Sequence, residues 1–248
     1  MVRRCNMIIL LSRLVLKPHT MALKGLEEHG LVLRTADDVH RIKDAFMSLR
    51  SASQKKDTLC NVVVAGAGAT GVEIAFDLAS IVKADELQEK IRISLIDAGP
   101  KLLSRFSPFI QKTAEKRAAS LQLRILRSKL VQKATGSTVQ LKDAGGDAVH
   151  DLPYDLLIWC GGVSTNPVLR SMKVPKNDRA KILVDPTLEV QGNHHIFAVG
   201  DNAAFFHAPS DGMLPPTAWA AVDEGVIAGK NIARRIKRKG LKSYKPPR

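Results

Sequence analysis

One stretch, residues 61–75 with the sequence NVVVAGAGATGVEIA, constrains the fold of this chain more than any other. An apolar run over 61–66 predicts a short buried strand, and the pattern over about 69–82 predicts a helix. Between them lie three glycines spaced as G-x-G-x-x-G. A strand, this spacing and a helix in that order are typical of the phosphate-binding turn of a dinucleotide-binding βαβ unit.

Each glycine has a separate physical reason in such a turn. Gly66 permits the tight turn, Gly68 lets the backbone approach a pyrophosphate, and Gly71 lets helix and strand pack closely. The N–H groups of the first helical turn, at Ala69 and Thr70, together with the helix dipole, then favour a phosphate. The alternative is a glycine-rich turn that holds no ligand.

Two acidic residues follow this turn. Asp97 ends the strand predicted over 91–96 and could accept hydrogen bonds from both ribose hydroxyls of an adenosine. A carboxylate there would repel a 2′-phosphate, so NADH is favoured over NADPH; alternatively, Asp97 only caps a turn. Glu73 is expected in the first turn of the binding helix, either near a nicotinamide or merely interacting favourably with the helix dipole.

The rest of the chain alternates predicted strands and helices. This alternation predicts an α/β fold, a Rossmann-like, doubly wound parallel sheet. Residues 143–147 are a turn by composition. We expect strands at 91–96, 123–126, 138–141, 154–159, 182–184 and 196–199, and helices at 108–121 and about 217–237.

Two later strands end in glycines that could face a ligand. The strand over 154–159 stops at Gly161 and Gly162, and the strand over 196–199 runs into Gly200 and Asp201. The Asp201 carboxylate could bind a polyol or cap a turn.

The last predicted helix begins after two prolines, which suits a helix start. Its small and apolar residues recur at helical spacing and predict a face packed against another backbone, most often as ordinary core. That face comprises Ala218, Val222 (or Ala221), Gly225, Gly229, Ile232 and Ile236.

The three cysteines, Cys5, Cys60 and Cys160, form no short paired spacing. We therefore expect no disulfide scaffold, dithiol redox pair or metal site, and a reducing intracellular compartment. Cys60 and Cys160 border apolar runs and are expected in the core. The short apolar run 7–11 follows two arginines, but a buried strand explains it better than a signal peptide.

The net charge of +14 is concentrated near the end of the chain. A basic end of this kind either contacts anionic lipid or nucleic acid, or is a solubilising tail that also suits a helix C-terminus. The basic residues there are Lys230, Arg234, Arg235, Lys237, Arg238, Lys239, Lys242, Lys245 and Arg248, with no acidic residue among them.

Together, these stretches resemble flavin-dependent pyridine nucleotide-disulfide oxidoreductases, and most closely type II (alternative) NADH dehydrogenases. The resemblance extends from about Gly25 to Pro246. It rests on the order and spacing of segments 25–30, 65–73, 96–103, 154–167, 184–188, 196–205 and 215–225.

The resemblance implies an NAD(H)-binding domain, residues 50–165, inserted in a partial FAD-binding domain made of residues 1–49 and 166–248. Hydride would pass from NADH to the flavin, and electrons would go on to an acceptor such as quinone. Glu73 is the candidate catalytic residue. NADH would be bound by Gly66, Gly68, Ala69, Thr70, Gly71, Glu73, Asp97, Gly161 and Gly162, and FAD by Gly200, Asp201, Pro216, Thr217 and Ala218.

The chain also departs from that family. The family opens with its own G-x-G-x-x-G loop for FAD, which no residues before Gly66 form, and its C-terminal part has no counterpart after Arg248. We therefore expect a chain shortened at both ends. Glutamines associated with the family's quinone site are replaced here by Trp219, Asp223 and Glu224, which puts quinone in doubt as the acceptor.

The alternative function is an NAD-binding regulatory or interaction module without flavin catalysis. The resemblance leaves open a homodimer or a complementing chain that supplies the flavin half. We expect a cytoplasmic protein or one peripheral at the inner face of a membrane, contacting it through the basic C-terminal tail. A nucleic-acid partner has only charge in its favour and is ranked last.

Overall fold

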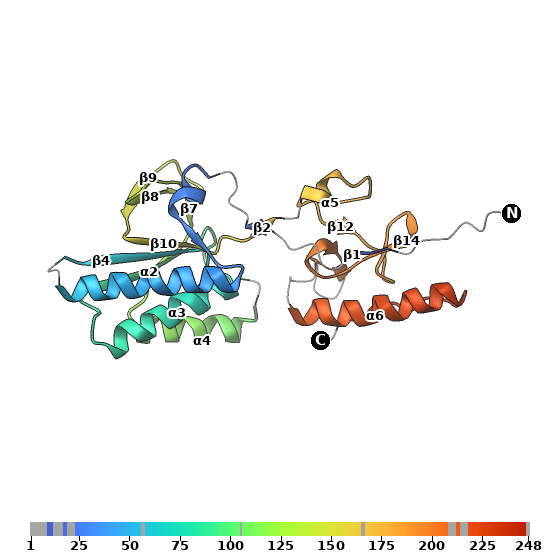
Figure 1. The fold of residues 1–248 in the computed structure, drawn as a ribbon, viewed down its shortest axis with the longest axis horizontal. Helices are drawn as coiled ribbons and strands as arrows, with labels where there is room; N and C mark the ends of the chain where they lie inside the picture. Colours follow the sequence, from blue (N-terminus) through green and yellow to red (C-terminus); the bar gives the residue numbers. More distant parts are fainter. Residues whose placement is uncertain are drawn as a thin grey trace. The chain divides into compact units, whose positions relative to one another are not determined.

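The structure is a computed structural model that describes residues 9–11, 17–18, 23–55, 58–104, 106–164, 167–207, 212–213 and 218–246. The chain forms two compact units (Figure 1). The central unit is Pro18–Val163, and the split unit combines Met1–Lys17 with Ser164–Arg248. The central unit is therefore inserted in the sequence of the split unit.

The central unit is built on a five-stranded parallel sheet. Its strand order is β3-β10-β4-β5-β6 with every neighbouring pair parallel, as in dinucleotide-binding sheets, but only one face carries helices, so the expected doubly wound arrangement is not formed. The strands β4 and β10 lie in the inner part of this sheet, and their apolar residues 62–65 and 156–159 are buried on both faces. The bounds are β3 Leu31–Val32, β4 Cys60–Ala65, β5 Ile91–Ile96, β6 Arg124–Leu126 and β10 Leu156–Trp159.

Three helices cover one face of this sheet. They are α2 (Ala36–Lys55), α3 (Ala69–Ala84) and α4 (Pro108–Ser120), and Figure 1 shows them together below β4 and β10. Alternate residues of β4, Val62 and Val64, belong to the core that these helices share. The first helix of the unit, α1 (Leu26–His29), is a single turn.

A second, antiparallel sheet covers the other face. It consists of β7 (Lys129–Ala134), β8 (Thr138–Asp143) and β9 (Val149–Pro153). Val63 and Ala65 of β4 pack into the core formed with this sheet. The parallel sheet is therefore covered by helices on one side and by strands on the other.

The split unit has smaller sheets and one long helix. Strand β1 (Ile9–Leu11) pairs parallel with β14 (Asn193–Ala198), and β13 (Glu189–Val190) pairs antiparallel with β14. Strands β12 (Ile182–Leu183) and β15 (Ala203–Ala204) form a second pair. The helices are α5 (Pro167–Ser171) and α6 (Ala218–Ile236), with a 3₁₀ turn, η1, at Gly200–Asn202.

Two further short strand pairs complete the described strands. Strand β16 (Phe206–His207) pairs with β17 (Gly212–Met213) in the split unit. Strand β2 (Lys17–Pro18) pairs with β11 (Val163–Ser164), where the chain passes from one unit to the other.

The unit boundaries differ from the expected domain boundaries at one side. The passage at Val163 and Ser164 lies close to the expected boundary after residue 165. The amino-terminal passage lies at Lys17 and Pro18 rather than after residue 49. The physical reason is that β3 pairs with β10 and α2 packs on the same sheet, which places residues 31–55 in the central unit.

Candidate functional site: the glycine-rich turn

Two of the three glycines are required by the packing of the chain itself. Gly66 has φ +111°, and a Cβ added there would lie 2.4 Å from the carbonyl oxygen of Cys160. A Cβ on Gly71 would lie 1.8 Å from the carbonyl oxygen of Gly66. Both positions exclude any side chain, so the turn and the close approach of helix to strand are fixed as predicted.

No packing contact within the described chain requires a glycine at position 68. Its backbone is extended, with φ −74° and ψ −177°, and a Cβ built there has no atom within 4 Å. The residue is exposed and is the N-cap of α3, with no side-chain capping bond. The space above Gly68 is therefore open at the positive end of a helix dipole, which fits a dinucleotide pyrophosphate.

Ala69 and Thr70 form the start of α3 and are both exposed. Their N–H groups precede the first intrahelical bond that involves the cap, from the Val72 N–H to the Gly68 carbonyl at 3.0 Å. Amides at this position have no partner inside a helix and are available to an anion. The residues at the turn thus fit the cofactor that the sequence implies.

Asp97 holds the glycine-rich turn in place. One carboxylate oxygen accepts the N–H of Ala67 at 2.6 Å and the other accepts the N–H of Gly99 at 2.7 Å. The sequence left a turn cap open as an alternative for Asp97, and these contacts are of that kind. The side chain is partly exposed, and each carboxylate oxygen can accept a further bond, so a ribose remains a compatible ligand.

The strand β10 brings Gly161 and Gly162 beside the same turn. The N–H of Cys160 donates to the carbonyl of Ala65 at 2.7 Å, and a Cβ on Gly66 would approach the nitrogen of Gly161 at 2.8 Å. Both Gly161 and Gly162 are exposed. Residues 95 positions apart in the sequence therefore meet at the carboxyl ends of β4 and β10, where ligands bind to open α/β sheets.

Glu73 does not lie where the sequence placed it within the helix. The helix begins at Ala69, so Glu73 is its fifth residue, and the first turn contains no acidic residue. The prediction of a first-turn position is wrong because the first turn of a helix that begins at Ala69 ends at Val72. Glu73 is exposed and begins the second turn of α3, where the effect of the helix dipole is weaker.

The described cysteines belong to the core of the central unit. Cys60 is buried, and Cys160 is partly buried and packs against the same cluster. Burial raises the pKa of the Cys160 thiol to about 12, so it is protonated at neutral pH. Among the residues the structure describes, no group of three or more His, Cys, Asp or Glu could hold a metal ion.

In the split unit, the Gly200–Asn202 turn packs against the first turns of α6. Gly200 has φ +65°, and its N–H donates to the Glu224 carboxylate at 2.5 Å. Asp201 is partly exposed, whereas Asn202 is buried and its side-chain oxygen has no partner in the described chain. Ala218 is the exposed first residue of α6. Pro216 and Thr217 lie outside the described residues.

Sequence reasoning missed the role of Glu224. This carboxyl is 4% exposed, and its burial raises its pKa; the Gly200 N–H and Lys181 act against that shift, and Asp201 adds to it. The available signal was periodicity, because the buried face of α6 comprises Ala220, Glu224, Ala228 and Asn231. Polar residues at helical spacing with alanines indicate internal hydrogen bonds.

The fold and the turn define a dinucleotide-binding α/β protein of the Rossmann type. The chain belongs to the pyridine nucleotide-disulphide oxidoreductase family, whose sequence model matches residues 16–225. The resemblance seen in the sequence is therefore confirmed at the level of the family.

Two relatives show which members of this family the chain is similar to. It is 30% identical over 210 residues to demethylphylloquinone reductase NdbB of Synechocystis sp., covering 85% of this chain and 49% of that protein. It is 28% identical over 240 residues to a type II NADH:quinone oxidoreductase of Staphylococcus saprophyticus, covering 90% and 57%. The chain thus spans about half the length of these relatives.

The fold also matches solved structures. The NDH2 of Plasmodium falciparum in complex with NADH superimposes with a TM-score of 0.67 at 22% identity, covering 76% of this chain and 42% of that one. Among the residues that the structure describes, every helix is too short or too polar to cross a membrane.

Proposed function

We propose that this chain takes part in NADH-dependent, flavin-linked electron transfer to a quinone. The observation that carries the proposal is Gly68, whose missing side chain leaves open space at the start of α3. A family of nucleotide-dependent oxidoreductases and relatives named as NADH:quinone oxidoreductases support the reaction class.

The central unit would bind NADH. The amides at the start of α3 and the bare backbone of Gly68 would hold the pyrophosphate. Asp97, which already accepts two backbone N–H groups, would accept the ribose hydroxyls with its remaining lone pairs, favouring NADH over NADPH. Gly161 and Gly162 would lie against the nicotinamide half, with Glu73 nearby.

The split unit would hold the flavin. Asp201 would bind the ribityl chain, and Ala218, with Pro216 and Thr217, would line the ring. When bound, the flavin supplies the hydride-accepting chemistry. The residues of the chain itself would position the flavin. The Glu224 carboxylate accepts the Gly200 N–H and so stabilises the turn that contains Asp201.

The proposed electron acceptor rests on the names of the relatives, and the proposed cellular location rests on the charge of the chain. Quinone is the acceptor in the names of the relatives, and the proposal keeps it despite Trp219, Asp223 and Glu224. The basic residues from Lys230 onward suit contact with anionic lipid, so we place the protein in the cytoplasm or at the inner face of a membrane. A homodimer or a complementing chain remains part of the proposal.

A titration with NADH tests the nucleotide site. Gly68→Val should weaken NADH binding tenfold or more, about 1.4 kcal/mol, because the new side chain occupies the open space above the turn. Gly136→Val is the matched control, since Gly136 lies in the loop between β7 and β8 and the nearest atom to a Cβ built there is 3.9 Å away. Equal NADH affinity in wild type and Gly68→Val would contradict the site.

A second measurement separates flavin catalysis from nucleotide binding alone. The purified chain is mixed with FAD, and bound-flavin absorbance and NADH oxidation with a soluble quinone are recorded. Retained absorbance and turnover support the proposed reaction. Normal NADH binding without flavin absorbance or turnover would restrict this chain to nucleotide binding.

A further inference from the structure

The loop that follows β6 lies beside Asp97, the residue expected to bind the ribose. Strands β5 and β6 are parallel, with Ile96 opposite Leu126, so Arg127 follows as the neighbour of Asp97 just beyond the two strand ends. The Asp97 N–H donates to the carbonyl of Leu126 at 3.0 Å, and the Asp97 carbonyl accepts the N–H of Lys129 at 2.9 Å. These bonds hold the two loops side by side at the carboxyl edge of the sheet.

A further contact brings the loop after β6 against the residues that follow Asp97. The N–H of Ser128 donates to the carbonyl of Gly99 at 3.1 Å, and the Gly99 N–H donates to an Asp97 carboxylate oxygen at 2.7 Å. Ser128 has φ +53°, in the left-handed region that residues other than glycine adopt rarely. Rare backbone conformations of this kind concentrate at binding sites, where surrounding contacts hold them.

A carboxylate of α4 holds the Arg127 side chain. The Arg127 Nη2 donates to Oε2 of Glu115 at 2.5 Å, and the two side chains are 39% and 38% exposed. An ion pair with this much exposure is weak, so the anionic group of a ligand can compete with Glu115 for the guanidinium. The contact therefore orients Arg127 and partly neutralises its charge.

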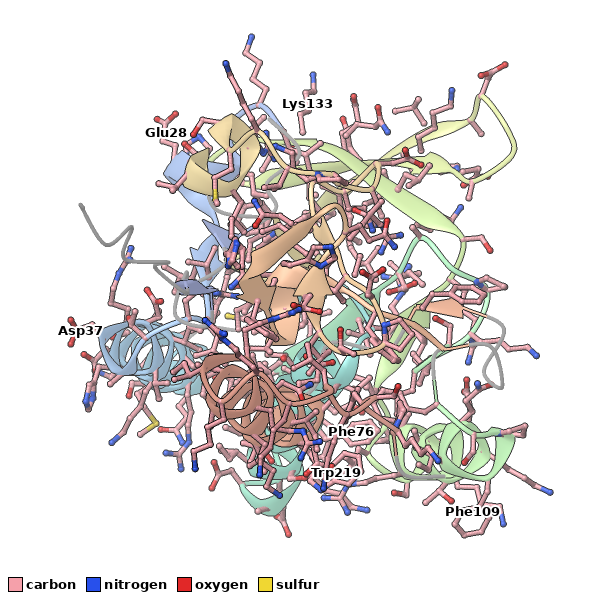
Figure 2. All side chains as sticks on the ribbon, turned by 90° about the vertical axis from the view of Figure 1, so that its right-hand side faces the viewer. Glu28, Asp37, Phe76, Phe109, Lys133 and Trp219 are labelled. Atoms are coloured by element: carbon pink, nitrogen blue, oxygen red, sulfur yellow. The ribbon has the colours of Figure 1, made fainter. Side chains whose placement is uncertain are left out.

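Contacts between α3 and α4 determine where α4 presents Glu115. The Arg117 guanidinium lies 5.6 Å from the centroid of the Phe76 ring, and Nζ of Lys83 donates to the Ser120 carbonyl at 2.8 Å. Phe76, labelled in Figure 2, belongs to α3, the helix that begins at the glycine-rich turn. The helix that would bind the pyrophosphate thus also positions the carboxylate that holds Arg127.

The charges beside the ribose decide whether a 2′-phosphate is accepted. In dinucleotide-binding sheets, an acidic residue at this point binds the 2′-hydroxyl, whereas an arginine nearby accommodates a 2′-phosphate. This chain has both groups, but Arg127 is paired with Glu115. The net charge of that pair is zero, so it does not offset the repulsion between the Asp97 carboxylate and a phosphate. A released guanidinium would bind the phosphate through two parallel hydrogen bonds.

We propose that Glu115 is a specificity-determining positioning residue, which holds Arg127 on α4 and thereby keeps the nucleotide site selective for NADH over NADPH. The inference rests on the proposed nucleotide site and adds two residues to it that lie outside the glycine-rich turn. Arg127 is then a latent ligand for a 2′-phosphate, already present beside the ribose position.

Titrations of the full chain with NADH and with NADPH test the proposal. Glu115→Ala should tighten NADPH binding about tenfold and change NADH binding less than about twofold, because only NADPH carries the phosphate that the released guanidinium binds. Alanine is the best helix former, so α4 is retained. Asp44→Ala is the matched control, since Asp44 is an exposed carboxylate of α2 and its loss changes the net charge equally.

A second substitution identifies the cation that carries the effect. Arg127→Gln, combined with Glu115→Ala, should remove the gain in NADPH affinity. Lys101→Gln in the same background should retain it, although Lys101 is an exposed cation in the loop that follows Asp97. A gain that depends on Lys101 and not on Arg127 overturns the inference.

The ratio of the two affinities separates selectivity from structural damage. A merely structural role of Glu115 would weaken both nucleotides alike and leave the ratio unchanged. An unchanged ratio in Glu115→Ala, or an equal change in Asp44→Ala, overturns the inference and leaves the NADH site in place. Absence of NADH binding to wild type, or NADH binding unaffected by Gly68→Val, contradicts the proposed nucleotide site and this inference with it.

Discussion

Glycines of one motif can be required for different physical reasons. Gly71 is needed because the chain packs against it, with the Gly66 carbonyl oxygen 1.8 Å from where a Cβ would be. Gly68 contacts nothing there and is needed only if a ligand approaches. The two positions therefore report on stability and on binding separately.

Gly71→Ala should destabilise the central unit. Alanine is the better helix former by about 1 kcal/mol, but a contact of 1.8 Å forces the helix away from the turn, which costs about 1–3 kcal/mol or more beyond that gain. Urea unfolding measures the loss. Gly136→Ala should change little, and equal midpoints for the two variants would show that the turn relaxes freely.

Burial of Glu224 should make the stability of the split unit depend on pH. Because its pKa is raised in the folded state, the unfolded carboxyl ionises first as the pH rises, and stability falls until the folded carboxyl ionises as well. Glu224→Gln keeps an acceptor for the Gly200 N–H and never ionises. Its stability relative to wild type should therefore increase with pH.

Unfolding curves of wild type and Glu224→Gln between pH 4 and pH 9 check this expectation. Below the ordinary range of a glutamic acid, the two proteins should differ least. A difference that stays constant over the whole range would contradict an ionisation effect at Glu224.

At the level of residues, the sequence predicted what depends on local backbone geometry. The roles of Gly66 and Gly71 follow from a turn between strand and helix, and both are seen in the structure. The contact between Glu224 and Gly200 joins residues 24 positions apart, and the sequence carried no pairing information for it. Asp97 stays a predicted ribose ligand, because no contact in the chain tests that role.

Elements with strong periodicity were predicted within one or two residues. The strand over Ile91–Ile96 has the expected bounds, and the helices at Pro108–Ser120 and Ala218–Ile236 end one residue before the expected ends. The expected turn at 143–147 is present, with the Gly146 N–H donating to the Asp143 carbonyl at 3.2 Å. Apolar strands and capped helices carry these signals locally.

The helix α2 was missed, although it has 20 residues. Its sequence is mostly polar, and only Ile42, Phe46, Leu49 and Ser53 are buried, so its periodicity is diluted. A capping signal was present: the Asp38 N–H donates to the Thr35 hydroxyl at 3.2 Å, and the Asp38 carboxylate accepts the Thr35 N–H at 3.0 Å. Reading the reciprocal Thr35 and Asp38 pair would have located the helix.

The packed face of α6 differs from the predicted one. Val222, Gly229 and Ile236 are exposed, whereas the buried residues lie on the opposite side of the helix. The prediction was wrong there because two residues of the buried face, Glu224 and Asn231, are polar and make their hydrogen bonds inside the unit.

Asn231 fastens two segments of the split unit, at Thr187 and at Lys242, to α6. It is fully buried; its side-chain nitrogen donates to the carbonyls of Thr187 at 3.0 Å and Lys242 at 2.8 Å, and its oxygen accepts the Lys242 N–H at 2.8 Å. The carboxyl-terminal segment is thereby held on α6. Sequence periodicity alone cannot show such a polar anchor.

Asn231→Ala should lower the stability of the split unit by about 2–4 kcal/mol, because it removes three hydrogen bonds and leaves a cavity. Chemical denaturation gives the value. Asn193→Ala is the control in the same unit, since the partly exposed Asn193 makes one bond, to the His195 N–H at 3.1 Å. A loss no larger than that of the control would contradict the anchoring role.

At the scale of the whole molecule, the chain has separate cores. The two large clusters of the central unit contain residues between Leu23 and Cys160, and the cluster of the split unit contains residues between Leu169 and Tyr244. No described core cluster has members in both units. The sequence predicted an inserted arrangement, but the assignment of β3 and α2 needed the sheet order, which no local pattern contains.

Separate cores predict two thermal transitions. Gly71→Ala should lower one transition and Asn231→Ala the other, because each changes packing within a single core. NADH should raise only the transition that Gly71→Ala lowers, since a ligand stabilises the unit that binds it. Calorimetry with and without NADH measures these three shifts, and one transition that moves with both substitutions would contradict independent units.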